Sequence, residues 1–255
     1  MIPEERRDRI LDLIREENVC SVKYLVKEFG VSRITIGRDL SILEDSGLIA
    51  KVHGGARAKK QDSSEFETRF SIRYKQNYRK KLQIAKKALG LVRPQGSIFI
   101  DSSTTAHIFG LEVFKHRFHD LNIVTNGPLL LQEAAEYPDF RIISTGGEFL
   151  RSFSMYSGEW VLDFLDKINI DSAFISAAGV SEDLKITTEH TELSSVLLKV
   201  IQKSSEVNLL IDSTKMFRKG MITVADLSDC TRIITDDDAT EDQKSIISRS
   251  GIEII

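Results

Sequence analysis

Short apolar segments that each end in small or polar residues recur in the second part of the chain, and they restrict its fold more than any other feature. Five of them lie at residues 97–100, 122–124, 141–143, 173–175 and 207–211. A helical pattern follows each of these segments. Continuous apolar strands that alternate with helices are typical of a mainly parallel sheet covered on both faces. We therefore predict an α/β domain built on such a sheet.

The polar residues after these strands form a candidate ligand site, because the carboxyl ends of parallel strands line the crevice where ligands bind. The first loop places hydroxyls and free amides at a helix N-terminus, which suits a phosphate group. Its residues are Asp101, Ser102, Ser103, Thr104 and Thr105. Helix capping alone explains any single loop of this kind, and the convergence of five loops on one sheet edge favours a ligand site.

Other strand ends supply complementary chemistry. Asp212, like Asp101, can accept hydrogen bonds from sugar hydroxyls, and Lys215 can place a positive charge beside a phosphate. Gly146 and Gly147 permit a close approach of the backbone to a ligand. Together these residues predict a site for a small phosphorylated molecule.

The first 56 residues have the spacing of a helix-turn-helix followed by a wing. Apolar residues at helical intervals predict helices over 4–17 and 22–29, with a short β-prone segment between them. Gly30 ends the second helix, and Ser32 caps a third helix that stops near residue 46. Residues 48–56 predict two short strands joined by a glycine turn.

The exposed side of the third predicted helix is rich in groups that donate hydrogen bonds. A helix in a major groove uses its N-terminal residues to contact phosphates and base edges, while a wing meets phosphates or the minor groove. The candidate DNA contacts are Ser32, Arg33, Thr35 and Arg38 on the helix and Lys51, His53, Gly54 and Gly55 on the wing. The alternative is a helical module that only mediates dimerisation.

The segment VSRITIGRDLSILEDSGLIAKVHGGA, which ends at Ala56, resembles the recognition helix and wing of the DeoR family of bacterial regulators. The resemblance extends to the D-S-S-T-T segment at 101–105, the T-N segment at 125–126, the glycine pair at 146–147 and D-S-T-K at 212–215. It covers about residues 6–236. The family pattern adds further candidate effector contacts, namely Thr125, Asn126, Gly179 and Glu192.

This resemblance implies a winged helix-turn-helix domain over residues 1–57, a linker over 58–72 and an effector-binding domain over 73–255. The family's effector domain is similar in fold to ribose-5-phosphate isomerase and CoA-transferase domains. The implied function is sequence-specific regulation at double-stranded operator DNA, most often repression of a carbohydrate catabolic operon that a phosphorylated sugar or related metabolite relieves. Because such regulators bind paired half-sites, we expect a homodimer or homotetramer.

Three departures from the family pattern affect these expectations. Gly37 replaces the first of two arginines, which costs about 1 kcal/mol of helix propensity relative to alanine and removes a DNA contact. Ala178 stands where the family often has an acid, and no Lys-Arg pair follows Glu192. We therefore expect altered DNA affinity or preference, and an effector other than a common sugar phosphate.

Charge and composition set the remaining expectations. Between residues 51 and 87 twelve basic residues accompany three acidic ones, which favours proximity to phosphates although the whole chain has a formal net charge of −3. No apolar run reaches the ~20 residues that cross a bilayer, and the N-terminus lacks a signal-peptide core. Because two cysteines suggest neither a disulfide framework nor a metal site, we expect a cytoplasmic protein without metal or cofactor.

The main alternative function is an enzyme that isomerises a sugar phosphate. Asp101, Asp212, Glu192 or Lys215 would then be the acid–base groups. The fused DNA-binding segment and the absence of an acid at Ala178 favour a sensor instead.

Overall fold

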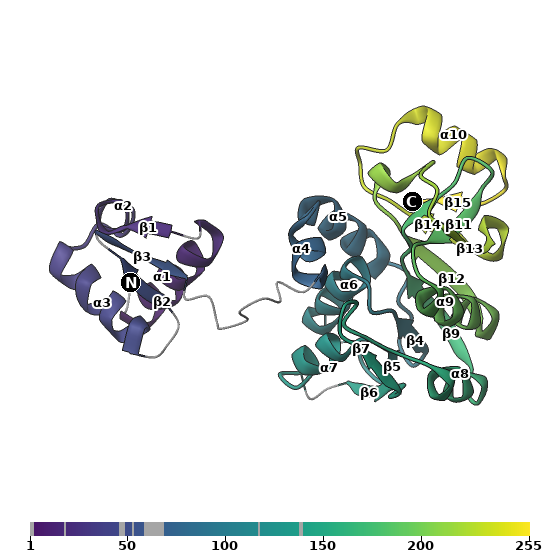
Figure 1. Cartoon of the computed structure of the whole chain (residues 1–255), viewed down its shortest axis with the longest axis horizontal. Coiled ribbons are helices and arrows are strands. Elements are labelled where there is room, and N and C mark those ends of the chain that lie inside the picture. The colour runs from purple at the N-terminus through teal and green to yellow at the C-terminus, as the bar shows by residue number, and fades with distance from the viewer. Residues whose placement is uncertain are drawn as a thin grey trace. The chain divides into compact units, whose positions relative to one another are not determined.

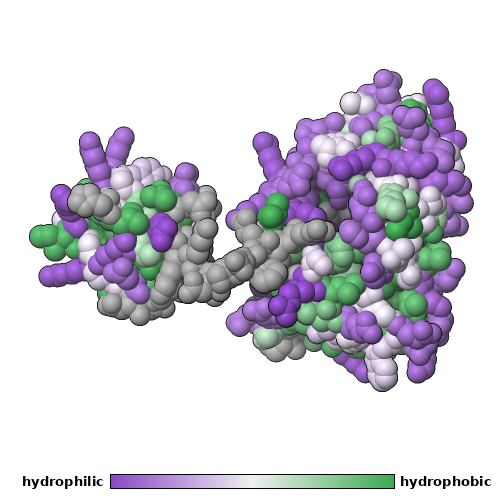
Figure 2. All heavy atoms as spheres, viewed as in Figure 1, coloured by the Kyte–Doolittle hydropathy of each residue, from purple (hydrophilic) through white to green (hydrophobic). Residues whose placement is uncertain are grey.

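The computed structural model describes residues 3–17, 19–45, 49–52, 54–58, 69–116, 118–137 and 140–255. The chain divides into two compact units, Met1–Glu67 and Thr68–Ile255 (Figure 1). Hydrophilic residues cover most of the viewed face of the larger unit, with apolar residues in small groups between them (Figure 2). Among the described residues, no helix is long and apolar enough to cross a bilayer.

The smaller unit is a helix-turn-helix with a three-stranded antiparallel sheet of order β1-β3-β2. Its elements are α1 (Pro3–Glu17), β1 (Val19–Ser21), α2 (Val22–Phe29), α3 (Arg33–Asp45), β2 (Ile49–Val52) and β3 (Gly55–Ala58). The Ser21 hydroxyl caps α2 by accepting from the Tyr24 amide at 3.1 Å, and Gly30 ends α2 in the left-handed conformation. This arrangement confirms the predicted winged helix-turn-helix.

An ion pair inside this unit fixes α1 against α3. The Asp39 carboxylate is almost fully buried, and Arg6 donates to it from Nε at 2.7 Å and from its guanidinium NH2 group at 3.3 Å. Apolar side chains from all three helices form the core of the unit, including Ile10, Leu25 and Ile36. Asp39 therefore holds the helices together from within and does not face the exposed side of α3.

The larger unit is built on seven parallel strands in the order β15-β14-β12-β9-β4-β5-β6. These strands are β4 (Ser97–Ile100), β5 (Asn122–Thr125), β6 (Arg141–Ser144), β9 (Ile170–Ile175), β12 (Ser204–Leu210), β14 (Arg232–Ile234) and β15 (Glu253–Ile254). Two small antiparallel sheets accompany them, one of β7 (Glu148–Leu150) and β8 (Met155–Ser157), the other of β10 (Gly179–Val180), β11 (Lys185–Thr188) and β13 (Ile222–Asp226). The predicted α/β class with a mainly parallel sheet is confirmed.

Helices cover both faces of this sheet, because successive strand residues point to opposite sides. In β4, Ile98 and Ile100 pack into a core with α5 (Tyr78–Leu89), α6 (Thr104–Lys115) and α7 (Pro128–Ala134), whereas Phe99 packs into a second core. The second core contains residues of α8 (Glu159–Asp166), α9 (Thr191–Lys203) and α10 (Glu241–Arg249). Burial on both faces explains why the buried segments of these strands have consecutive apolar residues.

The strand order places a topological switch point between β4 and β9. From β4 the chain adds β5 and β6 on one side, then crosses back to add β9, β12, β14 and β15 on the other. In sheets of this kind the loops on the two sides of the switch diverge and leave a crevice at the carboxyl ends. The ends of β4 and β9 therefore define where a ligand site is expected.

Two expectations about helices need correction. The apolar spacing of residues 82–89 predicts one continuous helix over 74–92, but this stretch contains the end of α4 (Arg69–Lys75) and all of α5, which are separated at Asn77 by a left-handed backbone with φ 55°. The acidic run at 236–238 precedes a predicted helix over 241–248 and suggests a helix cap, but Thr240 caps α10 instead by accepting from the Gln243 amide. The predicted linker over 58–72 overlaps β3 and α4 at its ends, and its residues 59–68 lie outside the described part of the chain.

Replacement of Asp39 by asparagine should destabilise the smaller unit. The amide keeps the shape of the carboxylate but loses its charge-assisted hydrogen bonds with Arg6, which are worth about 2 kcal/mol. Native-state hydrogen exchange of α1 and α3 amides in the full chain should report this loss. Glu28→Gln, which alters an exposed acid of α2, is the matched control; equal protection in the two variants would contradict a structural role for Asp39.

Candidate functional site

A pocket of about 420 Å³ lies at the carboxyl ends of β4, β9 and β12, beside the switch point. It is lined by residues from these strand ends together with residues of α4, α5, α9 and the segment after β11. Seven of the predicted effector contacts line it: Asp101, Ser102, Ser103, Thr104, Thr105, Asp212 and Lys215. The strand pattern thus brings together the loops after the first and last of the five predicted strands.

Asp101 links the two strands that flank the switch point. Its buried carboxylate accepts from the Ser103 amide at 2.9 Å and from the Ser176 amide, which follows β9, at 3.0 Å. Burial raises the pKa of Asp101, while these hydrogen bonds and the Lys215 charge oppose the rise. The side chain therefore fixes the shape of the pocket floor.

The N-terminal end of α6 opens into the same pocket. The Ser103 hydroxyl caps the helix by accepting from the Ala106 amide at 3.2 Å, and Thr104 and Thr105 are buried beside it. The first amides of an α-helix have no acceptor within the helix, and the helix dipole favours negative charge there. This end of α6 is suited to bind an anion such as phosphate.

Two lysines add positive charge to the pocket. Lys215 donates to the Ala177 carbonyl oxygen at 3.1 Å, and burial lowers its pKa despite the nearby Asp212 and Asp101 carboxylates. Lys81 of α5 is almost fully buried, and its pKa is lowered to about 8 by burial first and by Lys215 second. Both ammonium groups would be stabilised by an anion in the pocket.

The pocket also contains a polar group without a partner. The Ser176 side chain is 4% exposed, and its hydroxyl has no hydrogen-bond partner among the described residues. Buried hydroxyls are normally paired. The neighbouring Asp212 carboxylate, in contrast, accepts from the Thr214 amide at 3.2 Å and from the Thr214 hydroxyl. An unpaired hydroxyl on a pocket wall is available to hydrogen bond with a ligand group.

Apolar side chains form another part of the pocket lining. Ile72, Phe153, Leu193 and Ala178 line it, and the Phe153 ring lies 4.4 Å from the His190 ring, centroid to centroid. A pocket with convergent polar groups on one side and apolar side chains on the other is typical of small-molecule sites.

Six predicted effector contacts do not line this pocket, and four of them lie at the ends of β5 and β6, beyond the switch point. Thr125 and Asn126 are buried at the end of β5, where they hydrogen bond to Gly127 and to the Tyr156 carbonyl. Gly146 and Gly147 adopt positive φ after β6. Gly179 and Glu192 likewise have roles in their own segments and not in the pocket.

Gly179 is required by packing, since a Cβ there would collide with the Arg218 carbonyl oxygen. Glu192 is exposed in the first turn of α9, where its carboxylate accepts from the Thr191 hydroxyl at 3.1 Å. Gly147 is likewise demanded by the fold, because a Cβ would lie 2.7 Å from the Ser157 carbonyl oxygen. These two glycines shape the loops rather than the pocket.

Several pocket residues were not among the predicted contacts. They are Arg73 and Asn77 near the end of α4, Lys81 of α5, Ser176 after β9 and Arg218 after β12. The only sequence signal for Arg73 and Lys81 was the basic stretch, which does not distinguish a pocket residue from a surface one, and Asn77 had no such signal.

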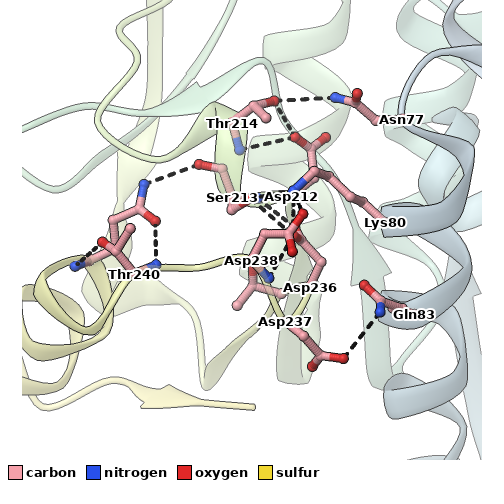
Figure 3. A network of polar contacts seen from close by, with 12 residues as sticks. Asn77, Lys80, Gln83, Asp212, Ser213, Thr214, Asp236, Asp237, Asp238 and Thr240 are labelled. Carbon is pink, nitrogen blue, oxygen red and sulfur yellow. Dashed lines mark hydrogen bonds and ion pairs between the residues drawn. The ribbon is translucent and has the colours of Figure 1, made fainter.

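Much of that basic stretch serves the larger unit internally. Lys80 donates to Asp236 at 2.8 Å, to Asp238 at 2.5 Å and to the Ser213 hydroxyl at 3.0 Å (Figure 3). Lys87 pairs with Asp237 at 2.8 Å. The acidic run therefore fastens α5 to the strand ends that carry the pocket, and these lysines do not form a free surface for DNA.

In the smaller unit, the exposed face of α3 carries the predicted DNA-reading groups. Arg33 and Arg38 are exposed, and so is Ile34, which the sequence did not single out. Ser32 and Thr35 are partly engaged in capping, since the Ser32 hydroxyl accepts from the Thr35 amide at 3.1 Å. The arginines can reach phosphates or guanine edges, and Ile34 can contact a thymine methyl group.

The wing carries the other predicted contacts. Gly54 has φ 80° in the turn between β2 and β3, which any side chain would strain, and a Cβ at Gly55 would collide with the Cys20 carbonyl oxygen. Lys51 is held against α3 by a 2.5 Å hydrogen bond to the Ser41 hydroxyl and a 3.5 Å ion pair with Glu44. His53 lies outside the described residues.

A winged helix-turn-helix with an arginine-bearing helix face, joined to an α/β unit with an anion-suited pocket, defines a ligand-responsive transcriptional regulator. The chain belongs to the DeoR family. Its residues 6–62 match the DeoR-like helix-turn-helix domain, and residues 76–237 match the DeoR C-terminal sensor domain.

The chain is similar to transcriptional regulators over nearly the whole length of both proteins. The chain is 34% identical to the transcriptional regulator GolR of Listeria innocua, over 91% of this chain and 89% of that protein. It is 29% identical to the glycerol-3-phosphate regulon repressor of Escherichia coli, over 91% and 90% of the two chains. The chain is accordingly a transcriptional regulator.

Among solved structures, ribose-5-phosphate isomerase A of Methanocaldococcus jannaschii matches 53% of each chain, with 19% identity and a TM-score of 0.39. The fold assignment depends on the parallel sheet and the family match.

Gly37 offers a direct test of the DNA-reading face. A Cβ at this position meets no atom within 4 Å, so Gly37→Ala should stabilise α3 by about 0.5–1 kcal/mol through helix propensity. Gly37→Arg should give the same stabilisation and also tighten binding to a DNA duplex. Each added phosphate contact steepens the slope of log affinity against log salt by about 0.9. Fluorescence anisotropy at several salt concentrations measures both; identical slopes in the two variants would place residue 37 away from DNA.

Proposed function

We propose that this chain is a repressor that binds double-stranded operator DNA through α3 and the wing. A phosphorylated sugar or related metabolite in the pocket of the larger unit would release it from DNA. The observation that carries the proposal is the composition of the pocket: a helix N-terminus, two lysines and an unpartnered serine hydroxyl meet at the switch point. Each of these groups favours an anionic oxygen.

The phosphate is assigned to the N-terminal end of α6, where the amides and hydroxyls of Ser102–Thr105 surround the pocket floor. Lys215 supplies charge, and Asp101 and Asp212 accept hydrogen bonds from ligand hydroxyls. Thr125, Asn126, Gly146, Gly147, Gly179 and Glu192 have no part in this assignment, because the pocket does not include them.

Two relatives support the choice of a phosphorylated effector and of repression as opposed to activation. One is named as a repressor of the glycerol-3-phosphate regulon and another, of Staphylococcus aureus, as a repressor of the lactose phosphotransferase system. Both names concern carbohydrate-related operons. We extend repression and a phosphorylated effector to this chain on that basis.

Operator recognition requires two copies of the smaller unit on paired half-sites, so we propose a homodimer or homotetramer. The protein would act in the cytoplasm, where both DNA and phosphorylated metabolites are found. Effector binding can weaken DNA binding only to the extent that it favours the DNA-free arrangement.

Arg38→Ala should weaken binding to DNA from upstream of the protein's own gene by about tenfold or more, since an arginine contact is worth about 1–3 kcal/mol. Wild-type affinity should also fall steeply with salt. Electrophoretic retardation with full-length protein measures both effects. Arg249→Ala, an exposed arginine of α10, is the control, and no difference between these variants would argue for a dimerisation module.

Phosphorylated ligands should stabilise the protein in a manner that depends on Lys215. Glucose 6-phosphate, fructose 1-phosphate and glycerol 3-phosphate are each compared with the unphosphorylated parent by thermal shift. A ligand at 100 times its Kd stabilises by about 2.7 kcal/mol, and Lys215→Met should remove this while the exposed Lys219→Met retains it. Equal stabilisation by the parent compounds, or retention of binding in Lys215→Met, would contradict a phosphate site.

A further inference from the structure

The short helix α4 lies between the pocket and the body of the larger unit. Its residues Ile72 and Arg73 line the pocket, as do the following Gln76 and Asn77. On another side, its Phe70 ring packs edge-on against His107 of α6, with ring centroids 5.4 Å apart. A change in the pocket therefore acts directly on α4.

The C-terminal end of α4 is held by a side chain from the pocket. Asn77 turns the backbone into the left-handed region, so the α-helical hydrogen bonds do not continue into α5. The Lys81 ammonium, from the first turns of α5, donates to the Arg73 carbonyl oxygen. A cation at this position donates to a carbonyl in the last turn of the helix and interacts favourably with the helix dipole.

The positive charge of Lys81 is only partly balanced by the charged groups around it. Its side chain is buried, Lys215 and Arg73 repel it, and Asp212 attracts it. No ion pair between Lys81 and a carboxylate is found within the described residues. A neutral carbonyl oxygen is a weaker partner for a buried ammonium than an anionic oxygen is, so an anion entering the pocket would compete for this donor.

We propose that Lys81 is an exchangeable ligand-binding residue, whose ammonium passes from the Arg73 carbonyl oxygen to the anionic effector when the effector binds. The inference rests on the proposed function, since it concerns the same pocket. The effector then gains a buried charge-assisted hydrogen bond, and the C-terminal end of α4 loses its cap. Asn77, whose side-chain amide donates to the Thr214 hydroxyl at 3.3 Å, remains as the hinge.

This exchange connects the pocket to the DNA-binding unit through the chain itself. Only ten residues separate β3, the last strand of the smaller unit, from the first residue of α4. Because α4 is the first element of the larger unit along the chain, loosening it acts on the smaller unit through the covalent connection between the two. Occupancy of the pocket is thereby expressed as a change in DNA affinity.

Lys81→Met tests the exchange without any ligand. Methionine is apolar and similar in length, so it suits the buried position while removing the donor. In full-length, ligand-free protein, amides of α4 should exchange with deuterium about tenfold faster than in wild type, because one charged hydrogen bond is lost. Lys86→Met places the same substitution at an exposed position of the same helix, and it should leave α4 exchange unchanged.

Inorganic phosphate serves as the probe in the second arm. In wild-type protein, saturation with phosphate should accelerate α4 exchange toward the Lys81→Met level, and in Lys81→Met it should add nothing. Stabilisation by phosphate that depends on Lys215, combined with unchanged or slower α4 exchange, overturns the exchange of Lys81 and leaves the proposed function intact. Unchanged α4 exchange in ligand-free Lys81→Met also overturns it. If neither phosphate nor the phosphorylated sugars stabilise the protein, the proposed function itself fails.

Discussion

The carboxylate of Asp101 joins the two halves of the larger unit at the switch point, where the order of strand addition reverses. It is the first residue after β4, and it binds the Ser103 amide on one side and the Ser176 amide, after β9, on the other. Without it, buried amides at the switch point would be left without acceptors, which costs about 1–3 kcal/mol for each. The entry into α6, the unpartnered Ser176 hydroxyl and the Ala177 carbonyl that binds Lys215 all depend on these two hydrogen bonds.

Opposite charges then hold the surrounding helices to this floor. The Lys80 and Lys87 side chains of α5 reach the acidic run after β14, and Asp236 also accepts from the Ser213 amide at 2.6 Å. Lys81, between them in sequence, faces the pocket instead. Consecutive lysines on one helix thus have different roles: one fastens the scaffold, and the next remains available to a ligand.

The sequence predicted the class of fold and the first pocket loop because both follow from local pattern. Apolar strands and the capping sequence around Ser103 are visible along the chain, whereas the order of strands in a sheet is not. Thr125 and Gly146 also follow strands, yet β5 and β6 lie across the switch point from β9 and β12. The pocket role of Lys81 could not be predicted for a related reason. The helix break at Asn77 turns α5 so that this lysine is buried, and that break depends on a tertiary contact with Thr214.

The energy available at Lys81 matches what a regulator of this kind requires. An effector shifts the balance between two arrangements only by its differential affinity for them, and typical coupling between sites amounts to about 1–3 kcal/mol. A charged hydrogen bond contributes about 1.5–3 kcal/mol, so moving one such bond from the end of α4 to the ligand suffices for a change in DNA affinity of about tenfold to a hundredfold. A surface lysine could not do this, because water would replace each hydrogen bond that the ammonium gave up. Burial excludes water, so the free energy depends on which partner the ammonium binds.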